Sequence, residues 1–264
     1  MIFDLHNDFP TALCDKDYAG YVDSIGDNTV TAAIWTSELS GDIIKTVGEI
    51  VARVRKLDKM RLPIAIEDIG FLYKDGKYLD FDFSVFSYCS LTWNYNNGFA
   101  GGALDNGTLT EAGQRVVNII NDRGCAVDLA HLNRSSFYPV LDCSRRVLCS
   151  HTGFNDHLRS LDDNQIRALV NRNAVIGLCT VTAFTDAHNL EQFADVIDRF
   201  VQKYSVDNLA IGSDFNGSKD IPKDISDYNG LNQVKDELLR RGYTTDDVYK
   251  IFYGNAHSFY IKER

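Results

Sequence analysis

Eight short apolar runs, separated by longer segments with helical spacing, constrain the fold of this 264-residue chain more than any other feature. Each run is almost continuously apolar rather than alternating, which is typical of parallel strands buried on both faces. The runs are Ile2–His6, Val30–Trp35, Pro63–Glu67, Phe86–Trp93, Ala126–His131, Arg146–His151, Ala174–Thr180 and Leu209–Asp214. The pattern therefore predicts a parallel sheet.

Helical patterns fill most of the gaps between the runs. Three of them are long segments in which apolar residues recur at helical spacing: Gly41–Leu57, Asn189–Tyr204 and Leu231–Arg241. Start and stop signals mark the others. Thr108 with Glu111 reads as a capping box, Ser160 with Asp163 as a weaker start, and Thr245–Phe252 as a last helix closed by Gly254 at its C′ position.

Strands that alternate with helices fit both a closed barrel and an open, doubly wound sheet. The count of eight strands favours the barrel, and so does the length, because (β/α)₈ barrels take about 250 residues as one domain. We therefore expect the α/β class and a single (β/α)₈ TIM barrel over residues 1–264.

Charge and composition limit the partners of the chain. The net charge is -10 and the pI is near 5.0, which argues against nucleic acid or an anionic membrane as partner. No secretory signal follows Met1, and no apolar stretch is long enough to cross a membrane. The six cysteines form no C-x-x-C pair, and four lie in apolar runs, so we expect them to be reduced and structural. These features together predict a cytoplasmic protein.

The chemistry lies at the ends of the predicted strands, where barrel active sites are built. His6 and Asp8 are two residues apart, so both side chains point to one side of an extended segment and can bind one metal. Five side chains at strand ends form the candidate ligand set: His6, Asp8, Glu67, His131 and His151. Such a set would hold two divalent ions, with Glu67 bridging them. Imidazole and carboxylate ligands suit zinc, but also iron, manganese or cobalt.

Simpler interpretations exist for each residue alone. A single strand-end histidine is more often a satisfied polar residue, and a strand-end acid often caps the next helix. Five such residues together favour the metal site. His157, His188 and His257 lie away from strand ends, and we expect them at the surface or in helices. Cys149 has no visible orienting partner for a thiol nucleophile.

The same residues resemble the renal or membrane dipeptidase family, peptidase family M19, within the amidohydrolase-type barrels. The resemblance runs in order from residue 4 to about residue 255. Its segments are Asp4–Pro10, Ala65–Glu67, Leu91–Asn94, Thr110–Gly113, Asp128–His131, Cys149–His151, Arg159 with Asp162 and Asp163, Ile211–Gly217 and, loosely, Gly254–Asn255.

The resemblance implies a binuclear zinc dipeptidase. It implies that His6 and Asp8 hold one zinc, that His131 and His151 hold the other, and that Glu67 bridges both. Arg159 matches the arginine that binds the substrate carboxylate, a role suited to a planar guanidinium. Asp214 matches the aspartate with an acid/base role, which a group at the same mouth can fill.

The chain departs from the family pattern in three places. Trp93 stands where mammalian members have a histidine that is thought to stabilise the oxyanion, and only its indole N–H could act there. The stretch between Asp8 and Glu67 is compressed, and Cys179–Val181 replaces a pocket segment of the family. Two alternatives therefore stay open: the same barrel acting on another amide, a lactone or a phosphoester, and a non-catalytic metal-binding member. A homodimer is a further expectation.

Overall fold

The fold is a closed barrel of parallel strands in the order β1 to β8, so the predicted α/β barrel is confirmed. The computed structural model describes residues 1–13, 18–57 and 62–261. The strands are β1 Phe3–Asn7, β2 Thr29–Trp35, β3 Ile64–Glu67, β4 Tyr88–Ser90, β5 Ala126–Asp128, β6 Val147–Thr152, β7 Val175–Leu178 and β8 Leu209–Ile211. All eight predicted runs contain a strand. The predicted runs that contain β4, β5 and β8 extend beyond the end of each strand, because their last residues leave the sheet.

Helices follow most of the strands, as the crossover rule for parallel sheets requires. They are α1 Phe9–Ala12, α2 Tyr18–Ser24, α3 Ile43–Arg55, α4 Glu111–Asp122, α5 Arg134–Cys143, α6 Asp163–Asn171, α7 Thr182–Thr185, α8 Leu190–Lys203, α9 Tyr228–Arg240, α10 Thr245–Tyr249 and α11 Asn255–Ile261. No helix is predicted from the sequence at α5, which carries Pro139.

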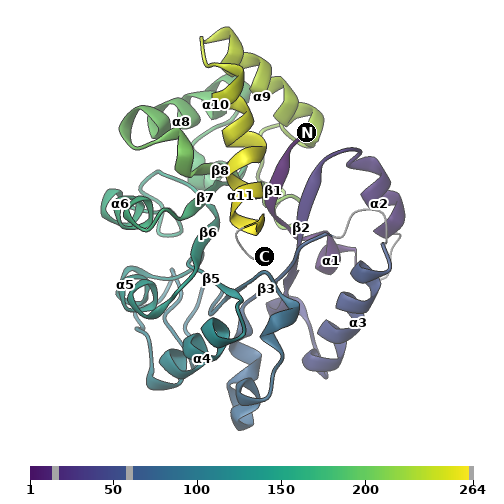
Figure 1. Cartoon of the computed structure of the whole chain (residues 1–264), viewed down its shortest axis with the longest axis vertical. Helices are drawn as coiled ribbons and strands as arrows, with labels where there is room; N and C mark the ends of the chain where they lie inside the picture. The colour runs from purple at the N-terminus through teal and green to yellow at the C-terminus, as the bar shows by residue number, and fades with distance from the viewer. Residues whose placement is uncertain (14–17, 58–61, 262–264) are drawn as a thin grey trace. The chain divides into compact units, whose positions relative to one another are not determined.

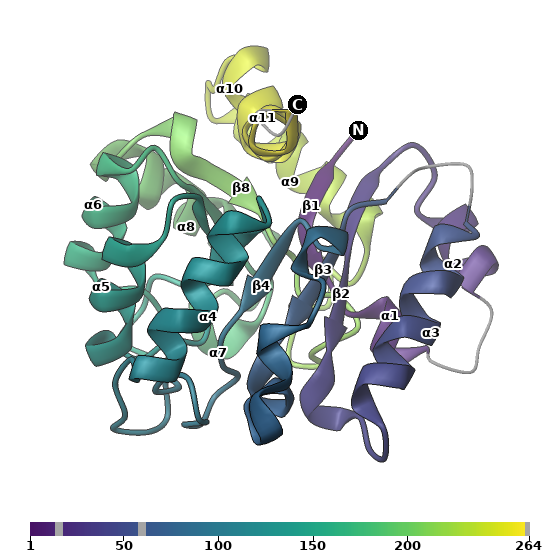
Figure 2. The ribbon, with the colours of Figure 1, turned by 60° about the horizontal axis from the view of Figure 1, so that its bottom comes forward.

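The chain divides into two compact units. The first unit comprises Met1–Asn7, Ala19–Thr31 and Ser150–Arg264, and the second comprises Asp8–Tyr18 and Ala32–Cys149. In the first unit α11 packs against β1, β7 and β8, and Figure 1 draws it in yellow over these strands. In the second unit α4 packs beside α5 and β5, and Figure 2 shows α4 next to α5. The expectation of one domain over 1–264 stays a prediction.

Two predicted helix starts are wrong by two residues. Helix α4 is capped by Thr110 rather than Thr108, because the Thr110 hydroxyl accepts from the Gly113 N–H while the Thr108 hydroxyl donates to the Ser135 carbonyl. Helix α6 is capped by Asp162 rather than Ser160. Asp162 forms a complete capping box with Gln165, and this satisfies backbone groups at both ends of the turn.

The predicted stop at Gly254 is also wrong. Residues Lys250–Gly254 form a π-helical turn, and α11 continues directly from it. The Asn255 side-chain amide donates to the Val206 and Leu209 carbonyls at 2.7 Å each, which holds this junction against the start of β8. Helix α9 begins at Tyr228, three residues before the predicted start, because Asp227 caps it.

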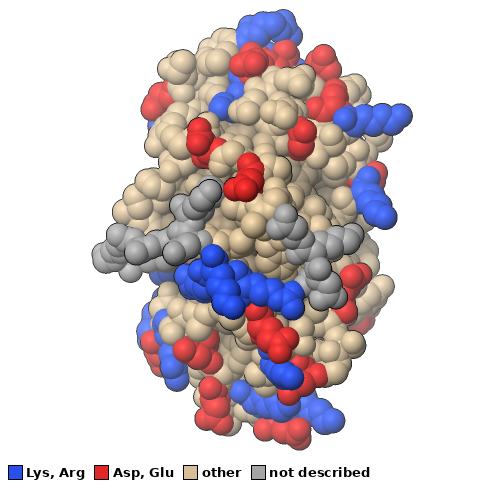
Figure 3. All heavy atoms as spheres, turned by 90° about the vertical axis from the view of Figure 1, so that its right-hand side faces the viewer, with Lys and Arg blue, Asp and Glu red and all other residues tan. Residues whose placement is uncertain are grey.

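Among the described residues, no helix combines the length and the apolar character needed to cross a bilayer. On the face drawn in Figure 3, Lys and Arg side chains form one short band and are otherwise interspersed with Asp and Glu. His157 and His188 are exposed, and His257 is half-buried in α11, as predicted.

Candidate metal centre and active site

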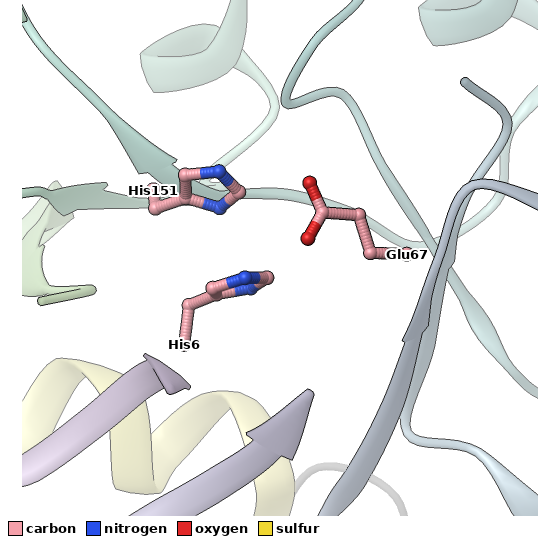
Figure 4. Close-up of side chains that lie close together, drawn as sticks. All are labelled: His6, Glu67 and His151. Carbon is pink, nitrogen blue, oxygen red and sulfur yellow. The ribbon is translucent and has the colours of Figure 1, made fainter. Parts of the chain in front are cut away.

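In the first unit two histidines from different strands lie close together. His6 in β1 and His151 in β6 are both buried, and their ring centroids are 3.9 Å apart. The Ser150 hydroxyl lies 2.9 Å from Nδ1 of His151 and 3.4 Å from Nδ1 of His6. Because Nδ1 of each ring faces this hydroxyl, Nε2 is the atom that each ring can offer to a metal. Figure 4 shows the two rings facing one another.

A buried carboxylate ties the ends of β1 and β8 together in the same unit. Asp4 accepts hydrogen bonds from the Ser213 N–H at 2.7 Å, the Ser213 hydroxyl at 2.5 Å and the Tyr228 hydroxyl at 2.7 Å. It also accepts from the His6 N–H at 3.2 Å. Burial raises the pKa of Asp4. Asp4 thereby fixes the backbone next to His6 and next to Asp214, a role that the sequence motif alone did not reveal.

Asp214 follows β8 in an uncommon backbone conformation. Its φ is 63°, and its N–H donates to the His6 carbonyl at 3.1 Å. A positive φ is uncommon for a residue with a side chain, although aspartate tolerates it better than most. The side chain is half-buried. The strand-eight aspartate, which the sequence predicts to be a catalytic acid or base, is therefore held beside His6.

In the second unit Glu67 and His131 form the corresponding pair. Glu67 ends β3, His131 follows β5 by three residues with φ 65°, and both side chains are buried. Nε2 of His131 lies 2.6 Å from Oε1 of Glu67, and Nδ1 lies 2.9 Å from the Asn94 amide oxygen. Asn94 is thus the orienting partner of His131. The sequence analysis quoted it only as part of a motif.

The other three predicted site residues differ in their surroundings within their own units. Asp8 occupies the N-cap position of α1, but its side chain forms no capping hydrogen bond, so helix capping does not explain this acid. Arg159 is buried rather than a surface charge. Its guanidinium lies 5.4 Å from the centre of the Phe184 ring, and one of its N–H groups donates to the His151 carbonyl at 3.4 Å. Trp93 is half-buried, with its ring 6.2 Å from that of His131.

Among the described residues, His6, His151 and Asp214 of the first unit and Asp8 and Glu67 of the second are candidate metal ligands. Figure 4 labels His6, Glu67 and His151. Imidazoles and carboxylates, with an outer polar contact such as that of Ser150, are the donors that divalent metals of the zinc type take in proteins.

The described cysteines offer no alternative catalytic nucleophile. All five described cysteines are free, and all but Cys143 are buried; Cys14 lies outside the described residues. Burial, with a smaller contribution from Asp214, raises the pKa of Cys179 to about 12. A thiol so reluctant to ionise is a structural group rather than a nucleophile.

A model of the membrane dipeptidase family, peptidase family M19, matches residues 44–258. The chain belongs to this family. A dipeptidase of Aspergillus oryzae, aclJ, is 28% identical to this M19 chain over 182 residues. That match covers 64% of the chain and 43% of the fungal protein, so it spans less than half the length of this relative.

Solved structures share the fold of this M19 chain. Dipeptidase AC, a metallopeptidase of family M19, superposes with a TM-score of 0.78 at 20% identity, covering 98% of this chain and 97% of that one. A metallopeptidase of Rhodobacter sphaeroides, bound to a phosphinate mimic of the dipeptide L-Ala-D-Ala, has a TM-score of 0.79 at 19% identity, with coverage of 100% and 99%. At these identities the likeness supports the barrel fold alone.

Proposed function

We propose that this chain is a metal-dependent dipeptidase. The observation that carries the proposal is the placement of imidazoles and carboxylates at the carboxyl ends of the strands, with each imidazole held by a neighbouring polar group. His6 and His151 share the Ser150 hydroxyl, and His131 lies between Glu67 and Asn94. The carboxyl ends of all barrel strands face one mouth. Membership of family M19 supports a divalent metal there, typically zinc.

The proposed ligand assignment uses the five strand-end residues. His6 and Asp8 would hold one zinc, His131 and His151 a second, and Glu67 would bridge both. Divalent metals of this type supply, when bound, an acidified water and polarisation of the scissile carbonyl. In this proposal Asp214 accepts the proton of the attacking water and returns it to the leaving nitrogen. Arg159 binds the terminal carboxylate of the dipeptide through its planar guanidinium.

The test is turnover of a dipeptide panel by the purified chain after loading with zinc, manganese or cobalt. We expect release of free amino acids, and a ratio of about two metals per chain in the most active sample. The Asp214→Asn variant should keep the metals and lose most of the activity, because proton transfer contributes about 10²–10⁴-fold to such reactions. Failure of every metal form on every dipeptide would contradict the proposal. Faster turnover of a lactone, cyclic amide or phosphoester would reassign the substrate.

A further inference from the structure

Three aromatic side chains of the second unit form a continuous wall, which we call the aromatic wall: Trp35, Trp93 and Tyr95. The rings of Trp35 and Trp93 are 5.1 Å apart, and those of Trp93 and Tyr95 are 6.1 Å apart. Both separations lie within the range in which aromatic rings attract one another. The wall ends beside His131, whose ring is 6.2 Å from that of Trp93.

The register between β2 and β3 places one residue of the aromatic wall on the same face of the sheet as a candidate ligand. Trp35 is the register partner of Glu67 on the neighbouring strand, and register partners in a parallel pair have side chains on the same face of the sheet. The Trp35 side chain therefore lies on the face that carries the Glu67 carboxylate. Thr11 fixes the end of β2, because its hydroxyl accepts from the Trp35 N–H at 2.9 Å.

The wall keeps surface available for a ligand. Trp35 and Trp93 are half-buried, and Tyr95 is 58% exposed. The indole Nε1 of Trp35 is buried and has no hydrogen-bond acceptor among the residues that the structure describes. Buried polar groups normally have a partner, so this donor points to an acceptor on a bound molecule. Rigid aromatic surface with one polar group is the usual composition of a small-molecule pocket.

We propose that the aromatic wall is the subsite for an apolar, preferably aromatic, side chain of the dipeptide. This inference rests on the proposed function and deepens it, because it names the substrate class. The large ring of such a side chain would lie against the Trp93 and Trp35 rings, and the Trp35 N–H would donate to a substrate oxygen. Glycine or alanine in the same position would leave the wall uncovered.

The composition of the chain supplies a selective probe. The sequence has two tryptophans, and both belong to the wall. Intrinsic tryptophan emission of the metal-loaded protein therefore reports on the wall alone. The ligands are two phosphinate dipeptide mimics, one with a benzyl side chain and one with methyl side chains only. We expect the benzyl mimic to shift the emission to shorter wavelength, with a Kd about tenfold lower than that of the methyl mimic, as an aromatic contact provides.

Variants separate the ring from its N–H. Trp93→Ala should reduce the tenfold preference to less than about twofold, and should raise KM for Phe-Ala or Ala-Phe more than KM for Ala-Ala. Trp35→Phe keeps an aromatic ring but removes the N–H donor, so it should weaken the binding of both mimics and leave most of the preference for the benzyl mimic in place. Tyr249→Ala, which removes an exposed ring from α10, is the matched control and should leave both Kd values unchanged.

The outcomes distinguish this inference from the proposed function. Equal Kd values for the two mimics, with dipeptides turned over, would overturn the wall and leave the dipeptidase standing. A retained benzyl preference in the Trp93→Ala variant would also overturn the wall. A Trp93-dependent preference without turnover of any dipeptide would support the wall as a ligand subsite and contradict the proposed function.

Discussion

In the first unit two histidines from β1 and β6 share one hydroxyl, that of Ser150, whereas in the second unit His131 has its own amide partner and contacts a carboxylate directly. Two imidazoles 3.9 Å apart have little attraction for one another without a cation. A histidine and a glutamate at 2.6 Å attract one another when no metal is bound, through the ring N–H. The second unit therefore supplies a preformed pair, and the first unit supplies a pair that metal would stabilise.

The largest expected effect comes from breaking the pair in the second unit. Glu67→Gln removes the carboxylate that we assign as the bridge. Loss of an outer partner of a metal ligand typically costs about 10–100-fold, so loss of the bridge itself should cost more in kcat/KM. The metal content should fall below two per chain. The control is Glu111→Gln, which changes an exposed glutamate on α4. Full activity of Glu67→Gln would refute the bridging role.

A smaller effect should follow from removing the outer partners. Ser150→Ala and Asn94→Ala leave all proposed ligands in place, so each should weaken metal affinity by about 10–100-fold in a competition with a chelator. Ser150→Ala should have the larger effect, because two rings lose their partner. Ser258→Ala on α11 serves as the control, since Ser258 is exposed and far along the chain from these partners. A larger loss for Asn94→Ala would reverse the comparison.

The smallest effect concerns acid stability at sites away from the ligands. In the first unit hydrogen bonds from Arg240 and then Arg241 lower the pKa of Glu237 to about 2. In the second unit hydrogen bonds from Ser84 are the main cause that lowers the pKa of Asp82. A carboxyl group whose pKa is lowered by folding stabilises the folded protein at pH values above its pKa in the unfolded chain. This stabilisation is lost as the pH falls toward the pKa of the group in the folded protein.

Glu237→Gln should therefore flatten the fall of Tm between about pH 4.5 and pH 2. Asp82→Asn should flatten it over a narrower range. Thermal melts at half-unit pH steps measure both, with the unchanged chain alongside. If the two variants keep the acid slope of the unchanged chain, these contacts do not contribute to acid stability.

The sequence predicted the barrel because the apolar runs of buried parallel strands can be recognised even where the exact ends of the elements cannot. It singled out candidate ligands because strand ends such as His6 and Glu67 are marked by a polar residue after an apolar run, and their role as ligands stays a prediction. It did not predict Ser150, Asn94 or Asp4 as partners, since a hydrogen bond between residues distant in the chain depends on three-dimensional placement.

Helix ends and the backbone turns after the strands were harder to predict from the sequence. Thr108 and Thr110 are both competent caps, and the contact of Thr108 with the Ser135 carbonyl decided between them. The positive φ of His131 and Asp214 redirects both side chains after their strands end, and no periodicity in the sequence encodes such a turn. Gly254 resembled a stop signal, although the structure uses it inside a continuing helical path.

The π-helical turn at Lys250–Gly254 changes the phase of the last helical segment. A π-turn accommodates one additional residue per turn, and one residue corresponds to about 100° of rotation around an α-helix. Apolar positions on either side of the turn, such as Val248 and Ala256, consequently face the core although a regular α-helical stripe would not join them. A helical wheel drawn through this region would misassign its inner face.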